Sequence, residues 1–148
     1  MYKKVLIATD GSDLADKALD QGLELAKTCG AEVIIMTVTD IWSALEMAHH
    51  VQAGEQNPVA DYEAAATAAA EKVLNAANDK AAKAGVECTT VHVRDRHPAQ
   101  GIIDTAKEKS CDLIIMSSHG RRGIEKILLG SVAAEVITHC EIPVLVAK

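Results

Sequence analysis

Five short apolar runs are spaced along the chain, and they predict the strands of a β-sheet. In the first two runs the apolar residues are consecutive, which is typical of strands buried on both faces of a parallel sheet. The third run alternates apolar and polar residues, which suits a strand at a sheet edge. The expected strands cover residues 4–9, 32–38, 86–93, 111–116 and 144–146.

Between these runs the apolar residues recur at helical spacing, so helices are expected to connect the strands. Gly30 and Gly85 follow the first two helical patterns, in the position where glycine commonly ends a helix. In the last helix, Val132, Val136 and Ile137 are expected to face inward. The expected helices cover residues 13–28, 61–84, 98–109 and 131–139, and a short helical turn is expected at 127–129. Residues 41–51 could add a short helix before a loop at 54–58.

Strands that alternate with helices predict an open parallel α/β sheet with right-handed crossovers. No linker or change of composition divides the chain, so residues 1–148 are expected to form one domain. If the strand order is 3-2-1-4-5, the order reverses between the first and fourth strands. Ligands of such sheets bind at the carboxyl ends of the strands beside that reversal. The turn at Thr9–Asp10 and the loop from Ser117 to Gly130 would then face one crevice.

Aromatic side chains are scarce in this chain, which has no phenylalanine and only Trp42, Tyr2 and Tyr62. The core must therefore be aliphatic, and a platform for stacking nucleic-acid bases is not expected. The net charge of −6 also gives no overall positive field that would recruit DNA or RNA. We therefore expect no nucleic-acid partner, whereas a small phosphate ligand would need only local positive charge.

The apolar run that follows Lys3–Lys4 ends at Thr9–Asp10, too early for a signal peptide. No segment reaches the length of a transmembrane helix, so membrane insertion is not expected. None of the cysteines forms a C-x-x-C pair, which favours free buried thiols in a reducing cytoplasm. These cysteines are Cys29, Cys88, Cys111 and Cys140.

The stretch after the fourth predicted strand has the composition of an anion site. It contains small residues and two arginines, Arg121 and Arg122, and a helical pattern opens at Ser131. A helix N-terminus presents unpaired N–H groups and the positive end of the helix dipole. Gly130 has no side chain to block an anion there, and Ser131 adds a hydroxyl donor. The glycine spacing matches neither a Walker A motif nor a dinucleotide fingerprint.

Four blocks of the sequence, at residues 5–12, 33–40, 112–131 and 143–146, resemble a single-domain universal stress protein of the nucleotide-binding type. Such proteins carry the motif G-x2-G-x9-G-[ST]. Here the motif reads Ser117-x2-Gly120-x9-Gly130-Ser131, with serine in place of the first glycine. The resemblance implies a Rossmann-like sheet of the adenine nucleotide alpha hydrolase type, with helices on both faces.

The resemblance also implies an adenine nucleotide ligand, either ATP or ADP or AMP, with Mg²⁺ on its phosphates. The Asp10 carboxylate would lie near the ribose hydroxyls, the Val38 backbone would contact adenine, and Met116 would pack on the ligand. The implied nucleotide-binding residues are Ala8, Thr9, Asp10, Val38, Met116, Ser117, His119, Gly120, Arg121, Gly130, Ser131, Val132 and Ala133.

Each of the main candidates also has a purely structural interpretation. Asp10 could belong only to a turn, in which Ser12 or Asp13 caps the first helix. His119 could hydrogen-bond within its own loop without touching a ligand. Arg121 and Arg122 could be solvated surface charges or salt-bridge partners, or they could reach the terminal phosphates.

The remaining histidines give weaker signals. His49 and His50 are adjacent and so cannot share a helix face, which favours an exposed loop pair over a metal site. His92 and His139 fall within expected secondary structure and are expected to be structural. The polar residues 95–97 are expected to form a solvated turn.

The favoured function is an ATP-binding universal stress protein that acts as a nucleotide-dependent regulator of a stress response. No nucleophile with an adjacent base is evident, so no catalytic residue is assigned. Two alternatives stay open: a non-nucleotide stress protein that acts through dimerisation and partner contacts, and a slow ATPase or phosphotransferase. The resemblance further implies a homodimer in which Val144, Leu145 and Val146 form an edge strand that pairs with a second copy.

Overall fold

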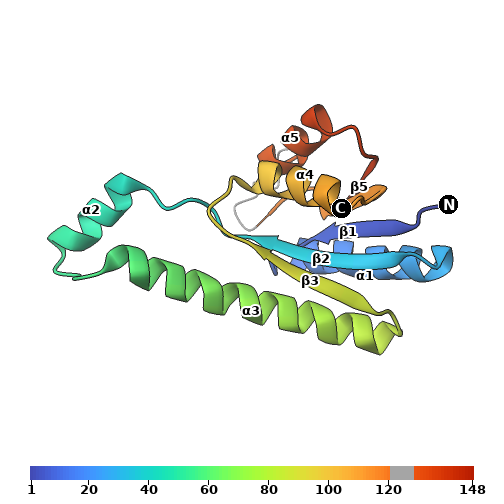
Figure 1. Ribbon diagram of the computed structural model, residues 1–148, viewed down its shortest axis with the longest axis horizontal. Helices are drawn as coiled ribbons and strands as arrows, with labels where there is room; N and C mark the ends of the chain where they lie inside the picture. The colour runs from blue at the N-terminus through green and yellow to red at the C-terminus, as the bar shows by residue number, and fades with distance from the viewer. Residues whose placement is uncertain (121–128) are drawn as a thin grey trace.

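The computed structural model describes residues 1–120 and 129–148, which form a five-stranded parallel sheet covered by helices (Figure 1). The strand order is β3-β2-β1-β4-β5, which confirms the expected order and the α/β class. In the described part of the chain the elements are β1 (Lys4–Ala8), α1 (Asp13–Cys29), β2 (Glu32–Val38), α2 (Ala44–Gln52), α3 (Pro58–Ala84), β3 (Cys88–Val93), α4 (Pro98–Glu108), β4 (Leu113–Ser117), α5 (Ser131–His139) and β5 (Val144–Ala147).

The central strands are buried on both faces. Ile7 of β1 is in register with Ile35 of β2 and Ile115 of β4, and all three side chains are 0% exposed. One apolar layer packs the sheet against α1 and α3, and the other packs it against α4 and α5. Figure 1 shows α4 and α5 on the opposite side of the sheet from α3. These two layers explain why the strand sequences are apolar without alternation.

Helix α3 is much longer than the strands that it covers. It has 27 residues, and its buried residues lie mostly in its second half: Pro58, Ala70, Leu74, Ala77 and Ala81. The last four recur at intervals of four, three and four, which places them on one helix face. The first half of α3, together with α2, extends beyond the ends of the strands (Figure 1).

Two strands begin two residues later than expected, because the preceding residues still complete helix ends. The Val86 N–H donates to Ala81 O at 2.9 Å, so β3 begins only at Cys88. The Cys111 N–H likewise donates to Ala106 O at 2.8 Å, and β4 begins at Leu113. β1 ends one residue before the expected boundary, and β4 and β5 each end one residue after it.

The helix boundaries also differ from expectation in the segment between β2 and β3. α3 begins at Pro58, although residues 54–58 were expected to be a loop, because proline suits the first helical turn, where its missing N–H is not needed. The short helix expected at 41–51 is α2, whose first turn is capped by the Ser43 hydroxyl. His49 and His50 therefore lie in the last turn of α2, so their assignment to a loop is wrong.

The inner face of α5 is also corrected. Ala133 and Val136 are buried, whereas Ile137 is 46% exposed and faces away from the core. Residues 127 and 128 of the expected short helical turn lie outside the described residues.

Asp112 fastens the beginnings of β1 and β4 together. Its carboxylate accepts hydrogen bonds from the backbone N–H groups of Lys3, at 2.8 Å, and Lys4, at 3.0 Å. These two donors stabilise the charged form and lower the pKa of Asp112. A lowered pKa means that this contribution to stability is present above the unfolded-state pKa and is lost as the pH falls through the folded-state pKa.

We therefore expect Asp112→Asn to be less stable than wild type at pH 7, because the amide can supply only one acceptor oxygen to the two N–H groups. The difference should shrink as the pH falls below about 4, where the wild-type carboxyl is also protonated. Urea unfolding at pH 7 and at pH 3 measures both effects. The matched control is Asp79→Asn, which changes an exposed carboxylate on α3. A stability difference for Asp112→Asn that is the same at both pH values would contradict the assignment.

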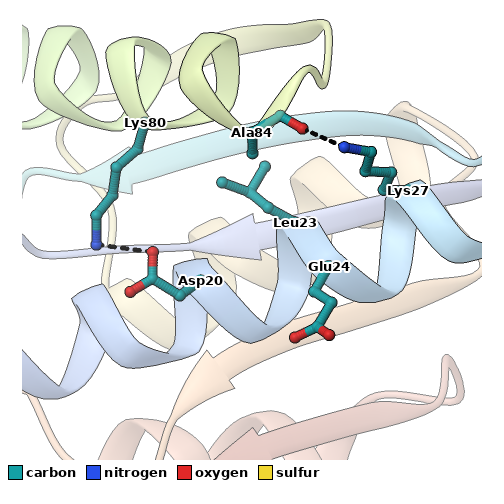
Figure 2. Close-up of a pocket in the computed structure, with 6 residues that line it drawn as sticks. All are labelled: Asp20, Leu23, Glu24, Lys27, Lys80 and Ala84. Carbon is teal, nitrogen blue, oxygen red and sulfur yellow. Dashed lines mark hydrogen bonds and ion pairs between the residues drawn. The ribbon is translucent and has the colours of Figure 1, made fainter.

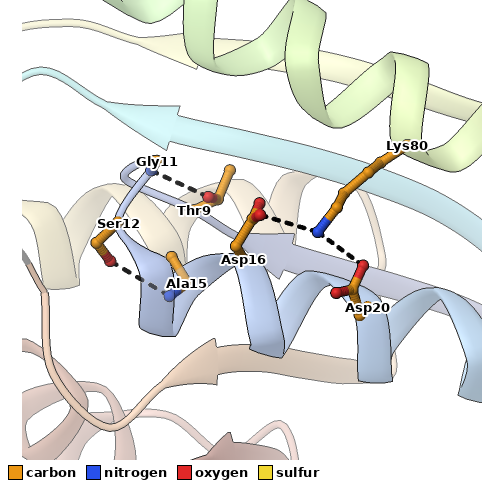
Figure 3. Close-up of polar contacts among 7 residues, drawn as sticks. All are labelled: Thr9, Gly11, Ser12, Ala15, Asp16, Asp20 and Lys80. Carbon is orange, nitrogen blue, oxygen red and sulfur yellow. Dashed lines mark hydrogen bonds and ion pairs between the residues drawn. The ribbon is translucent and has the colours of Figure 1, made fainter.

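A charged link joins α1 to α3. The Lys80 ammonium lies 2.9 Å from the Asp16 carboxylate and 2.8 Å from the Asp20 carboxylate (Figure 3). Burial lowers the pKa of Lys80, but the two carboxylates outweigh it and raise this pKa overall. Lys27 donates to Ala84 O at 2.8 Å and so satisfies a carbonyl at the end of α3 (Figure 2).

These contacts border a shallow hollow of about 260 Å³ between α1 and α3 (Figure 2). The hollow is lined by Asp20, Leu23, Glu24, Lys27, Lys80 and Ala84. Lys27 and Ala84 belong to the last turns of their helices, which lie toward the beginnings of the strands. The hollow is therefore at the opposite end of the sheet from the carboxyl edge, where parallel α/β sheets bind ligands.

Candidate functional site

Two turns meet at the carboxyl ends of β1 and β4, which are neighbours in the sheet. A Cβ atom built on Gly120 would lie 2.9 Å from Oδ2 of Asp10, so the β1–α1 turn touches the loop after β4. The strand order reverses at this point, since β2 lies on the other side of β1. The structure therefore brings the two segments together at the switch point of the sheet, where crevices form in this class of fold.

The turn after β1 is held by its own side chains. The Gly11 N–H donates to Thr9 Oγ1 at 3.2 Å, and the Ser12 N–H donates to Asp10 Oδ1 at 2.9 Å. Ser12 then caps α1 by accepting from the Ala15 N–H at 3.2 Å (Figure 3). The turn-and-cap interpretation is thus confirmed for Ser12. Asp10 belongs to the same turn, yet its second carboxylate oxygen also faces Gly120 of the loop after β4.

The loop after β4 is fixed by a short chain of hydrogen bonds. The Ser117 hydroxyl donates to His119 O at 2.8 Å, and the Ser118 N–H donates to Ala147 O at 2.8 Å. The Gly130 N–H donates to Ser118 O at 2.7 Å, which joins the two ends of the loop. Ser117, which replaces the motif glycine, therefore uses its hydroxyl within the loop.

Residue 130 must be glycine because a side chain does not fit there. Its φ of −69° suits any residue, but a Cβ atom there would lie 2.9 Å from Ser118 O and 3.4 Å from the Cα of His119. Gly130 is the N-cap of α5, and no side chain in the described residues caps this helix. The first turn of α5 also contains no acidic residue. A small anion fits the backbone N–H groups of such an uncapped helix start.

His119 contributes an unsatisfied ring nitrogen beside this helix start. Its Nδ1 lies 3.1 Å from the Ser118 hydroxyl, so the interpretation of His119 as a hydrogen-bonder within its loop is confirmed for that nitrogen. Its Nε2 is shielded from solvent and has no hydrogen-bond partner in residues 1–120 and 129–148. Buried polar atoms are nearly always paired, so this nitrogen points to a missing partner.

The other candidate residues are placed as follows. Val38 ends β2, and its two methyl groups would lie 3.1 and 3.3 Å from a Cβ atom on Gly101 of α4. Met116 and Ala133 are 5% and 2% exposed and belong to the core beneath α4 and α5. Arg121 lies outside the described residues.

A second polar cluster at the ends of β2 and β3 was not singled out from the sequence. Thr39 Oγ1 lies 2.6 Å from His92 Nε2, and a hollow of about 100 Å³ opens beside them toward α3. Burial lowers the pKa of His92, and the positive charge of Arg94 lowers it further. The Tyr62 hydroxyl donates to Asp40 O at 3.0 Å and ties α3 to the segment after β2. In the sequence, only the polar residues that directly follow β2 and β3, Thr39 and Arg94, signalled this cluster.

Within the described residues, no group of three or more histidine, cysteine, aspartate or glutamate side chains could hold a metal ion. No described helix is long and apolar enough to cross a membrane. All four cysteines are free thiols, as expected, although only Cys111 is buried and the other three are partly exposed. Burial raises the pKa of Cys111 to about 11, so this thiol stays protonated at neutral pH.

The fold and these two adjacent turns define a class, a Rossmann-like parallel α/β domain with a glycine-bearing loop at the switch point of its sheet. The chain matches the Universal stress protein family over residues 1–148, and it belongs to that family. It is 33% identical to Universal stress protein YxiE of Bacillus subtilis (strain 168), with 100% of each chain covered. The family inferred from the sequence is thereby confirmed.

Two solved structures agree with this assignment. The structure of the hypothetical protein MJ0577 has a TM-score of 0.79 and 30% identity, and covers 100% of this chain and 96% of its own. A universal stress protein solved in complex with cAMP has a TM-score of 0.73 and 27% identity, and covers 99% of this chain and 97% of its own.

Proposed function

We propose that this chain binds an adenine nucleotide in the crevice between the β1–α1 turn and the start of α5, and that it acts as a nucleotide-dependent regulator in a stress response. The observation that carries the proposal is the uncapped N-terminus of α5, opened by a glycine that leaves no room for a side chain. A related universal stress protein that was solved with cAMP supports the choice of ligand. In this proposal residues 1–148 act as one domain.

The phosphates would lie at the first turn of α5, against Gly130, Ser131, Val132 and Ala133. Backbone N–H groups there are positioned to donate to an anion, and the helix dipole favours negative charge. Asp10 would accept from the ribose hydroxyls across the crevice. These are the groups on which we expect affinity to depend most.

The remaining contacts would contribute less to the affinity. Ala8 and Thr9 would line the ribose and adenine side, and Val38 would contact adenine through its backbone. Met116 would act as the packed support beneath the ligand, since its side chain is buried. Ser117, His119 and Gly120 would approach the ribose and phosphates, and Arg121 would reach the phosphates.

Mg²⁺ would enter with the nucleotide. This ion keeps several waters and is usually held by one or two carboxylates together with substrate phosphates. Asp10 is engaged by the ribose in this proposal, and the described residues hold no cluster of three potential metal ligands, so the ion would be bound mainly through the phosphates. We expect no all-protein cage for it.

A thermal-shift experiment tests the proposal. ATP, ADP and AMP, each with Mg²⁺, should raise the melting temperature of the purified protein, because a ligand that binds only the folded state stabilises it by about 2.7 kcal/mol at a hundred times its Kd. GTP is the control for general effects of a nucleotide. Equal shifts with GTP, or no shift with any adenine nucleotide, would contradict an adenine site.

We also propose a homodimer that forms through the free edge of β5. The carbonyls of Pro143 and Ala147 accept from Ile114 and Ser118 of the β4 segment, at 2.9 and 2.8 Å. By the alternation of strands, the backbone groups of Val144 and Val146 therefore face away from the sheet. An exposed strand edge of this kind favours pairing with another strand.

Val146→Pro should separate such a dimer into monomers, because proline removes an outward N–H while leaving the bonds to β4 in place. Val146→Ala, which keeps the N–H, is the matched control and should stay dimeric. Light scattering at micromolar concentration measures both. A monomeric wild type, or a dimeric Val146→Pro, would exclude pairing through β5.

A cytoplasmic location stays a prediction, supported by the free cysteines. Cell fractionation with a tagged chain would test it, and recovery of the protein in an oxidising compartment would overturn it.

A further inference from the structure

Ser118 is firmly held in the described part of the loop after β4. Its side chain is buried, its N–H donates to Ala147 O at 2.8 Å, and its carbonyl accepts from the Gly130 N–H at 2.7 Å. Its hydroxyl then lies 3.1 Å from Nδ1 of His119. The backbone that carries this hydroxyl is therefore fixed by two hydrogen bonds, one to β5 and one to the start of α5.

The His119 ring is held from two directions. The Ser117 hydroxyl donates to His119 O at 2.8 Å and fixes its backbone, while Ser118 contacts the ring. The ring carbon Cδ2, which is bonded to Nε2, would lie 3.6 Å from a Cβ atom on Gly130. The Cδ2–Nε2 edge of the imidazole therefore lies beside the N-cap of α5. The Nε2 atom at this edge is shielded from solvent and unpaired in the described part of the chain.

We propose that Ser118 is a positioning residue, which donates its hydroxyl proton to Nδ1 and so holds His119 in the tautomer whose Nε2–H donates to the nucleotide phosphates. This inference rests on the proposed nucleotide site and names a further determinant within it. A neutral imidazole has one donor nitrogen and one acceptor nitrogen. If Nδ1 accepts from Ser118, Nε2 must carry the proton, and a phosphate oxygen at the start of α5 is the acceptor that satisfies it.

The opposite tautomer has a different consequence. Nδ1–H would donate to the Ser118 oxygen, and Nε2 would become an acceptor beside a site that is built from donors. A phosphate has no donor to offer it near neutral pH, so the buried nitrogen would stay unpaired in the complex. The arrangement around Gly130 therefore favours the Nε2–H form, since it adds one more donor to the backbone N–H groups of α5.

Two substitutions of His119 separate the roles of its nitrogens. Gln places an amide N–H₂ near the position of Nε2, whereas Asn reaches only the position of Nδ1. ATP affinity should fall roughly tenfold to a hundredfold in His119→Asn and stay within roughly threefold of wild type in His119→Gln. Adenosine, which has no phosphate, should bind wild type and both variants equally, which excludes a general collapse of the loop.

Nitrogen-15 NMR of the histidine rings tests Ser118 directly. Wild type should show His119 with a protonated Nε2, and ATP should shift that resonance. Ser118→Ala should show a mixture of the two tautomers and a severalfold weaker affinity for ATP. A wild-type ring protonated at Nδ1, or equal ATP affinities of wild type and His119→Asn, would overturn the inference while leaving the nucleotide site intact. A wild type that binds no ATP would overturn both proposals.

Discussion

Gly130→Asp is expected to lower the affinity for ATP by roughly a hundredfold or more, the largest change in binding expected of any single substitution in this chain. Two effects act together. The new Cβ atom would meet Ser118 O at 2.9 Å, and the carboxylate would lie where the phosphates are proposed to bind. An N-cap aspartate would also accept the N–H groups of α5 itself, so it would replace the anion as well as repel it.

The control for charge is Gly130→Asn, which has the same shape without the carboxylate. It should bind ATP more weakly than wild type, because it shares the steric conflict, but at least roughly tenfold more tightly than Gly130→Asp. Circular dichroism and a melting curve establish that both variants fold. If Gly130→Asp is folded and binds ATP as wild type does, the phosphates do not lie at α5.

Ile115→Ala is expected to produce the largest loss of stability. Ile115 is fully buried at the centre of the sheet, in register with Ile7 of β1 and Leu145 of β5. Removing its outer carbons loses apolar burial and leaves a cavity, which together cost about 2–5 kcal/mol of unfolding free energy. Urea unfolding measures this as a fall in the midpoint.

The matched control is Ile137→Ala on α5, which makes the same chemical change at a residue that is 46% exposed. It should change the unfolding free energy by no more than about 0.5 kcal/mol. Helical spacing alone placed Ile137 on the inner face, whereas the structure turns it outward. A large loss for Ile137→Ala and a small one for Ile115→Ala would therefore contradict the structure.

The sheet could be predicted well from the sequence because its strands are covered on both faces. Continuous apolar runs such as those around Ile7 and Ile35 are typical of buried parallel strands, and their alternation with helical patterns indicates the α/β class. The strand order followed from the fold class and could not be read from any single strand.

The boundaries were less predictable where neighbouring elements share residues. Val86 and Cys111 are apolar and lie two residues before β3 and β4, so the sequence pattern assigned them to these strands. Their N–H groups instead close the ends of α3 and α4, which depends on the helix geometry. Whether Ile137 points into the core or toward solvent depends on how α5 packs on the sheet, and the local sequence pattern does not determine that packing.

The candidate site was predictable in its backbone and unpredictable in its side-chain contacts. Gly130 and Ser131 could be recognised because they stand at the start of a helix that follows a buried strand. A glycine in that position leaves the helix N-terminus open to an anion. The contact between Asp10 and Gly120 depends on the sheet order. The pairing of Thr39 with His92 joins the residue after β2 to a residue of β3, and sequence spacing does not predict it.

The central claim is an adenine nucleotide site at the start of α5, and an equilibrium titration of nucleotide-free wild-type protein with ATP and Mg²⁺ tests it most directly. Calorimetry should show saturable binding of one nucleotide to each chain, and the same titration of folded Gly130→Asp should show an affinity that is lower by roughly a hundredfold or more. Absence of binding to the wild type up to millimolar ATP would contradict the claim.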